Sequence, residues 1–93
     1  MTLEEIKRSV KEDILIGRLR LEDIGPEDIG DDEPLFGSGL GLDSVESLEV
    51  ILGMEGLCGT RLDAVPVQEL RGALQSVNTI ARFVQDRLAA VQV

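Results

Sequence analysis

The stretch GLGLDSVESLE, residues 39–49, decides the fold, because a glycine-rich loop ends in it and a helix begins. Asp43 and Ser44 are both residue types that cap helix N-termini, and Gly59 is a helix stop, so we expect a helix from Ser44 to about Cys58. This places the Ser44 hydroxyl at a loop-to-helix junction. Since Asp43 can cap equally well, the helix does not require Ser44 for capping.

Three more helical patterns flank this segment. Residues 1–19 open with a Thr2–Glu5 capping box and carry apolar residues at helical spacing. A long loop over residues 20–43 follows, and such loops in small domains are commonly functional. A short helix is predicted near Pro66–Leu74, and a last helix after Ser76. The residues expected on the buried side are Leu3, Ile6, Val10, Ile14 and Gly17 in the first helix, Leu21, Ile24, Ile29, Leu35 and Leu40 in the loop, Val67, Leu70 and Leu74 in the third helix, and Val77, Ile80, Val84 and Leu88 in the last.

Strand signals are absent, so the sequence predicts an all-α protein, a small four-helix bundle with a long first loop and a short third helix. Its length of 93 residues suits a single domain spanning 1–93. Because the chain has only two aromatic residues, Phe36 and Phe83, the core is expected to be aliphatic.

The helix that begins at Ser44 has two apolar faces. The wider face is the expected core side and holds Val50, Ile51, Met54, Leu57 and Cys58. The second face carries Val45, Leu48 and Leu52 and is flanked by Glu49 and Glu55. Burial of both faces is one interpretation. We favour exposure of the second face as a docking surface for a partner that is apolar in the middle and basic at its rim.

Charge is unevenly distributed along the chain. Residues 21–60 hold eleven carboxylates and no Lys or Arg, whereas the rest holds seven acids and nine bases. The net charge of −9 argues against nucleic acid and anionic membranes as partners and favours proteins with basic patches. One cysteine, no signal peptide and no membrane-length apolar run indicate a cytoplasmic protein, with a monomer as the default.

Catalysis by Ser44 itself is disfavoured because the chain has no histidine and no Gly-x-Ser-x-Gly motif. The only lysines, Lys7 and Lys11, lie in the first helix. Carboxylates over residues 22–33 do not match an EF-hand loop, so no metal site is predicted. Cys58 is expected to be a buried, small apolar residue. A serine in this setting is better suited to being modified than to acting as a nucleophile.

With these features together, the chain resembles the acyl carrier protein family over nearly its whole length. The resemblance is carried by Leu35-Phe36 and by residues 39–49, with Asp43-Ser44-Val45 followed by a Leu-Glu pair at positions 48 and 49. The order of helices and the acidity of the second helix agree with that family. The resemblance implies a bundle of the acyl-carrier type.

By resemblance, Ser44 receives 4′-phosphopantetheine from coenzyme A through a separate, Mg²⁺-dependent phosphopantetheinyl transferase, which recognises Asp43. The chain is then a carrier and not an enzyme: it holds acyl groups as thioesters and presents them to acyl-loading and acyl-processing enzymes in fatty-acid, polyketide or related biosynthesis. The residues implied to contact these partners are Val45, Leu48, Glu49, Leu52 and Glu55.

The chain departs from the family pattern at three positions. Gly53 and Gly56 lower the intrinsic helix stability by roughly 1 kcal/mol each, which predicts a short or bent end of the second helix. Cys58 stands where the family often has an aromatic residue. Two alternatives remain open: a carrier of aminoacyl or peptidyl groups, and an unmodified acidic helical adaptor that binds a basic partner.

Overall fold

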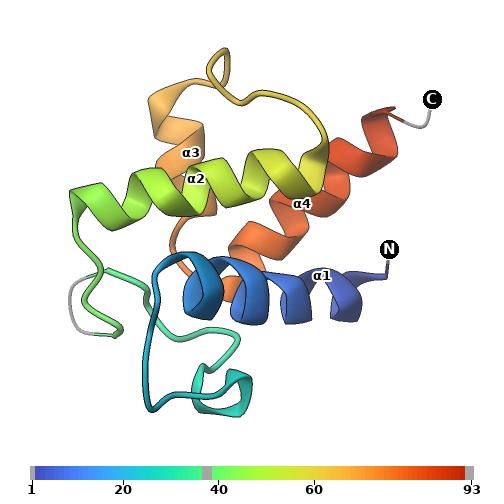
Figure 1. The fold of residues 1–93 in the computed structure, drawn as a ribbon. Helices are drawn as coiled ribbons and strands as arrows, with labels where there is room; N and C mark the ends of the chain where they lie inside the picture. The colour runs from blue at the N-terminus through green and yellow to red at the C-terminus, as the bar shows by residue number, and fades with distance from the viewer. Residues whose placement is uncertain (1, 37–38, 92–93) are drawn as a thin grey trace.

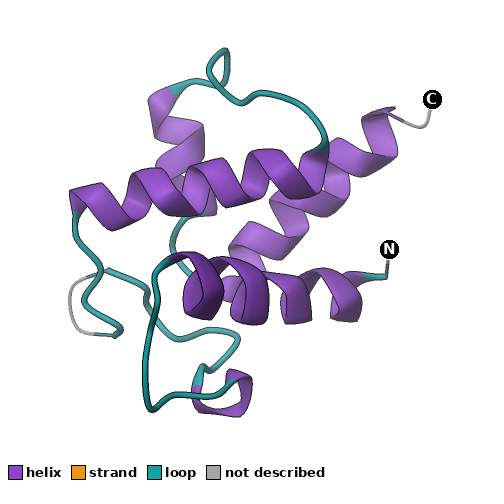
Figure 2. Ribbon diagram, in the orientation of Figure 1, coloured by secondary structure: helices purple, strands orange, loops and turns teal. Residues whose placement is uncertain are grey.

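The computed structural model describes residues 2–36 and 39–91. Within them, helices account for all regular secondary structure apart from one isolated β-bridge between Phe36 and Leu42. The chain forms α1 (Leu3–Ser9), η1 (Val10–Arg18), η2 (Pro26–Asp28), α2 (Ser44–Cys58), α3 (Val67–Ala73) and α4 (Val77–Val91). This confirms the predicted all-α class with a long first loop and a short third helix (Figure 2).

The helices pack as a small bundle around one apolar core. Element α2 packs chiefly against η1, and α4 packs against α1, α2 and the short α3. In Figure 1, α1 and α2 run across the front in opposite directions and α4 crosses behind them. The long loop leaves η1, passes beneath it and rises again to the start of α2. Within the described residues, no helix combines the length and the apolar character needed to cross a bilayer.

The first helix differs from the sequence-based expectation in its second half. The Thr2–Glu5 capping box is present, with reciprocal hydrogen bonds of 2.9 and 3.2 Å. From Val10 onward, however, the turns are π-helical, so each is wider than an α-helical turn. The buried stripe over Ile6, Val10 and Ile14 is therefore not continued by Gly17, which is exposed; Leu15 is buried instead. The prediction for Gly17 was wrong because it assumed α-helical spacing throughout.

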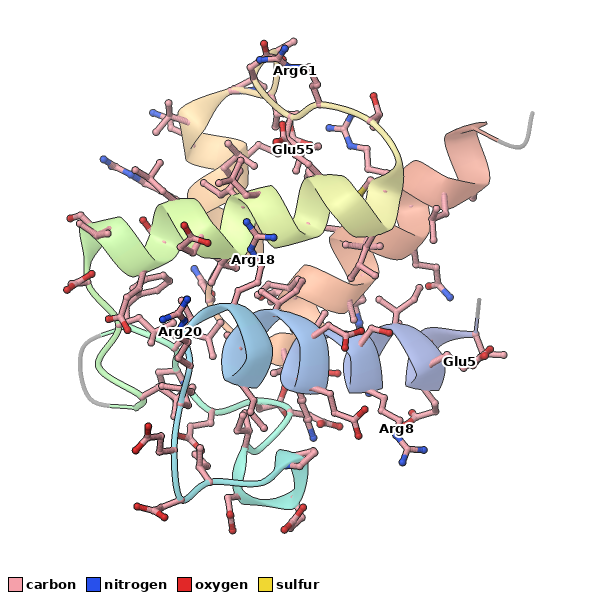
Figure 3. The ribbon with its side chains drawn as sticks, in the orientation of Figure 1. Glu5, Arg8, Arg18, Arg20, Glu55 and Arg61 are labelled. Atoms are coloured by element: carbon pink, nitrogen blue, oxygen red, sulfur yellow. The ribbon has the colours of Figure 1, made fainter. Side chains whose placement is uncertain are left out.

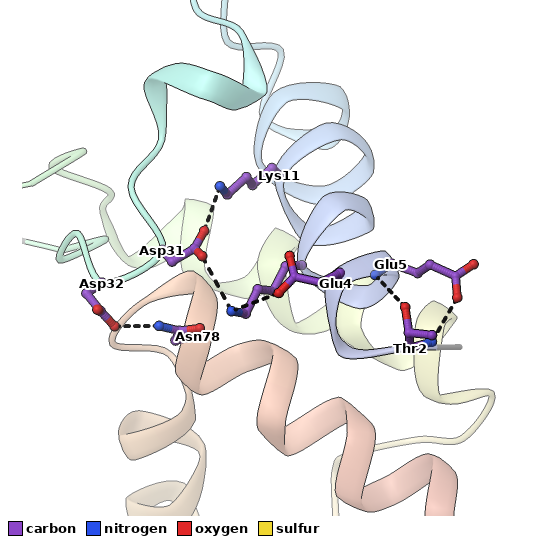
Figure 4. Close-up of polar contacts among 8 residues, drawn as sticks. Thr2, Glu4, Glu5, Lys11, Asp31, Asp32 and Asn78 are labelled. Atoms are coloured by element: carbon purple, nitrogen blue, oxygen red, sulfur yellow. Dashed lines mark hydrogen bonds and ion pairs between the residues drawn. The ribbon is translucent and has the colours of Figure 1, made fainter.

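The long loop is attached to the core as predicted. Ile29 and Leu35 are fully buried, while Ile24 and Leu40 are partly buried against the core and Leu21 is half-buried. Polar contacts add to this apolar attachment. The Asp31 carboxylate pairs with Lys7 (3.4 Å) and Lys11 (2.7 Å), and Asp32 accepts a hydrogen bond from Asn78 Nδ2 at 2.6 Å (Figure 4).

The bounds of α2 match the prediction. The Asp43 carboxylate accepts the Glu46 N–H at 2.9 Å, Glu46 Oε1 accepts the Asp43 N–H at 3.0 Å, and Gly59 ends the helix with a φ of 69°. The helix is not shortened at Gly53 or Gly56. A Cβ at Gly53 would lie 2.7 Å from Ile14 Cγ1, so this glycine allows close contact between α2 and η1.

The third and fourth helices agree with the predicted stripes except at one position. Leu74, Val77, Ile80 and Val84 are buried, and Leu70 and Leu88 are partly buried against the core. Val67 is 64% exposed, because it is the first residue of α3. Its predicted burial was wrong. The fully buried side chains are aliphatic or sulfur-containing, as expected, and both phenylalanines are partly buried.

Candidate functional site

At the start of α2, the residue that caps the helix and the residue with the exposed hydroxyl are different residues. Asp43 supplies the cap, and its carboxylate is held by the Glu46 N–H. Ser44 is the first residue of the helix and is exposed. Its backbone carbonyl accepts the Ser47 hydroxyl at 2.7 Å, whereas no hydrogen bond of its own hydroxyl is found among the described residues. The Ser44 hydroxyl is therefore accessible to a modifying enzyme without disturbing the cap.

A hollow of about 370 Å³ lies beside Ser44. Its lining comes from the long loop, the first turn of α2 and the end of α3, and consists of Phe36, Leu42, Asp43, Ser44, Ser47, Arg71 and Leu74. The volume falls within the range of small-molecule sites, roughly 300–1,000 Å³. The hollow beside the hydroxyl thus offers apolar side chains from three elements and one arginine.

Sequence reasoning identified Ser44 and Asp43 but missed Phe36 and Arg71 as lining residues. Arg71 is distant in sequence from Ser44 and belongs to no local motif. It reaches the site because Leu35 N–H donates to Gln75 O at 3.0 Å and Leu42 N–H donates to Leu35 O at 2.9 Å, which joins the loop to the end of α3. No sequence signal marks these long-range contacts.

The second apolar face of α2 is exposed, as the favoured interpretation predicted. Val45, Leu48 and Leu52 are 70, 62 and 48% exposed, whereas Val50 and Met54 on the other face are fully buried. Exposed Val67 extends the apolar surface onto α3. Between α2 and α3 lies a further hollow of about 370 Å³, which Leu48, Leu52, Val67 and Leu70 help to line. We call Val45, Leu48, Leu52 and Val67 the apolar stripe.

The two glutamates beside the apolar stripe have intramolecular partners. Glu49 Oε2 lies 3.2 Å from the guanidinium of Arg18, which extends from η1 towards α2. Glu55 Oε2 accepts the backbone N–H of Leu62 at 2.6 Å, on the side of α2 facing the loop that carries Arg61 (Figure 3). Both residues are half-buried. Glu55 in particular holds the α2–α3 loop.

Cys58 is buried at 3% exposure on the core face, as predicted, and burial raises the pKa of its thiol. In the native protein this thiol is therefore protonated and shielded from reagents. Within residues 2–36 and 39–91, no group of three or more His, Cys, Asp or Glu side chains is arranged to hold a metal ion.

Comparisons of the chain with protein-family models, with characterised proteins and with solved structures give no significant match.

Proposed function

We propose that this protein is an acyl carrier protein whose Ser44 carries 4′-phosphopantetheine. The proposal rests chiefly on the start of α2, where Asp43 caps the helix and Ser44 is exposed. A bundle of the acyl-carrier type, with a long loop leading to an Asp-Ser pair, is part of the same proposal.

The residues around Ser44 fit a phosphopantetheine group. An exposed hydroxyl at the start of a helix can reach the phosphorus of coenzyme A bound to a transferase, and the adjoining hollow offers apolar walls and one guanidinium. The attached group would supply a thiol on a flexible arm, on which acyl groups are held as thioesters. Attachment joins the Ser44 oxygen to the pantetheine-side phosphorus of coenzyme A and breaks the P–O bond from that phosphorus to the bridging oxygen of the pyrophosphate. Adenosine 3′,5′-bisphosphate leaves with the bridging oxygen, and the hydroxyl proton is released.

The apolar stripe supports the choice of partners. Three of its residues, Val45, Leu48 and Leu52, follow Ser44 on α2, and the segment around them, residues 21–60, carries eleven acids and no base. Such a surface suits the transferase and acyl-processing enzymes that present apolar side chains within a basic rim. Val45, Leu48 and Leu52 would supply most of the contact. Glu49 and Glu55 would contribute charge while keeping their contacts to Arg18 and Leu62.

Intact mass spectrometry tests the proposal. The protein is incubated with coenzyme A, Mg²⁺ and a broad-specificity phosphopantetheinyl transferase, beside the Ser44→Ala and Ser47→Ala variants. We expect a gain of one phosphopantetheinyl group in the native chain and in Ser47→Ala, and none in Ser44→Ala. Ser47 is a matched control because it lines the same hollow one turn further along α2.

The apolar stripe also favours one other function, an unmodified adaptor that binds a basic partner. That function predicts no mass gain with any of several transferases and unchanged partner binding by Ser44→Ala. The adaptor function would be excluded if the native chain is loaded and only the loaded form binds the partner.

A further inference from the structure

A second hollow extends the site around Arg71. It has a volume of about 470 Å³ and is lined by Asp32, Pro34, Phe36, Arg71, Leu74, Gln75, Ser76 and Thr79. Three of these residues, Phe36, Arg71 and Leu74, also line the hollow beside Ser44. Arg71 therefore borders both hollows and lies in the last turn of α3.

Among residues 2–36 and 39–91, Arg71 forms no ion pair. The arginines that form ion pairs there are Arg8, Arg18, Arg61 and Arg87, each with a carboxylate within 4 Å. Arg20 and Arg82 likewise form none among the described residues, but of these three arginines only Arg71 lines the hollow beside Ser44. Asp43, the carboxylate that shares the hollow with Arg71, has its Oδ1 engaged by the Glu46 N–H.

A phosphodiester on Ser44 would add a negative charge to the most acidic part of the chain. Asp43 lines the hollow on the same side as Ser44, so a phosphate there meets repulsion unless a cation is near. The planar guanidinium of arginine presents paired donors that match phosphate oxygens. Arg71 is the base that lines this hollow.

We infer that Arg71 is a positioning residue that pairs with the phosphate joined to Ser44. Through this pair it directs the first part of the phosphopantetheine arm into the second hollow, between the long loop and α3. This inference rests on the proposed function, because it requires a phosphate on Ser44. It assigns Arg71 a role before any partner enzyme binds. Arg71 is exposed and can adjust its side chain to the phosphate, and the pair is expected to weaken as salt rises.

Nuclear magnetic resonance on the loaded protein tests the inference, after mass spectrometry has established loading. The Arg71 Nε–Hε signal, assigned by its loss in Arg71→Gln, is compared before and after loading at about pH 6. We expect loading to shift this signal and to slow its exchange with water, and about 0.5 M NaCl to reverse part of the change. The Arg82 signal should not move, because Arg82 is an exposed residue of α4 outside the lining of both hollows.

The phosphorus spectrum supplies an independent measurement. The ³¹P signal of loaded Arg71→Gln should differ from that of the native protein, and the signal of loaded Arg82→Gln should not. Loading with an unchanged Arg71 Nε–Hε signal would overturn the inference and leave the carrier function standing. Failure of the native chain to load would overturn both. The comparison of the native Nε–Hε signal before and after loading tests the inference even where Arg71→Gln loads slowly. Slow loading of Arg71→Gln would by itself show that Arg71 also contacts the transferase.

Discussion

Asp43 and Ser44 are neighbours with separate tasks, and the separation is a matter of single hydrogen bonds. Asp43 accepts the Glu46 N–H at 2.9 Å and so satisfies a backbone donor that the first turn of α2 leaves open. Ser44 begins the helix, and the described residues offer its hydroxyl no hydrogen bond. The residue that stabilises the helix is thus distinct from the residue proposed to be modified.

Substitution of each residue by alanine should therefore change the stability by unequal amounts. Asp43→Ala should lower the free energy of unfolding by about 1 kcal/mol through loss of the cap, while Ser44→Ala should change it by less than about 0.5 kcal/mol. Urea denaturation followed by circular dichroism measures both. Equal destabilisation by the two variants would show that Ser44 contributes to the cap and would spoil Ser44→Ala as a control for loading.

Glu55 is the residue at which partner binding and stability must be separated. Its carboxylate accepts the N–H of Leu62, a residue only 1% exposed. Glu55→Ala leaves that donor without this acceptor and should cost about 1–3 kcal/mol, whereas Glu55→Gln keeps an acceptor and should cost less. Thermal unfolding of the two variants provides the comparison. If both unfold like the native protein, Glu55 is free to serve the partner surface alone.

Between the elements α2 and η1, Gly53 allows a close contact. A Cβ at this position would lie 2.7 Å from Ile14 Cγ1 and 3.1 Å from Arg18 Cδ, whereas a Cβ at Gly56 would meet no atom within 4 Å. The two glycines therefore differ although both lie inside the same helix. Gly53 is explained by packing; nothing in the structure requires Gly56.

This difference predicts opposite signs for two matched substitutions. Gly53→Ala should destabilise the protein by about 1–3 kcal/mol through overpacking against Ile14, and Gly56→Ala should stabilise it by up to about 1 kcal/mol through helix propensity. Chemical denaturation of the pair checks the prediction. A stabilised Gly53→Ala variant would mean that α2 and η1 can separate without loss.

The same elements show what sequence patterns can and cannot specify. Caps and stops act over three or four residues, so Asp43, Gly59 and the Thr2–Glu5 box could be located in advance. The π-helical turns after Val10 could not, since no capping or spacing signal in the sequence marks them, and they made the prediction for Gly17 wrong. Arg71 was missed for a related reason: its place beside Ser44 follows from the contact between the long loop and α3, which no local pattern encodes.

At the scale of the whole molecule, the long loop is fixed to the first helix by charge as well as by apolar burial. Asp31 lies between Lys7 and Lys11, and Glu4 also pairs with Lys7 at 3.6 Å. The Lys11 contact, followed by that with Lys7, holds the pKa of Asp31 below its ordinary value of 3.8. The stabilisation by this carboxylate is therefore present above about pH 4 and is lost as the pH falls through the lowered pKa.

Asp31→Asn tests this attachment of the loop. The variant should be less stable than the native protein by about 1 kcal/mol at pH 7, a modest value because Asp31 is partly exposed. The difference should stay constant down to about pH 5 and shrink below pH 4, because the protonated native carboxyl no longer pairs with the lysines. Urea unfolding at a series of pH values provides the measurement. A difference that grows towards low pH has the wrong sign for this account.

The apolar stripe and the acidic segment act together on partner encounter, but their contributions differ in range. Charge steers over about 10 Å at 0.1 M salt, whereas Leu48 contributes only once it is in contact. Leu48→Ser should therefore lower kcat/KM for transferase loading about tenfold, as expected for loss of an interface anchor, while stability changes by less than about 0.5 kcal/mol.

Raising NaCl from about 0.05 to 0.5 M should slow loading of native and Leu48→Ser protein by the same factor, because the substitution leaves the charges unchanged. Ala89→Ser, at an exposed position of α4, serves as the control and should load at the native rate. A native loading rate for Leu48→Ser, with no dependence on salt, would mean that the transferase recognises the loop side of Ser44 and that the apolar stripe serves other partners.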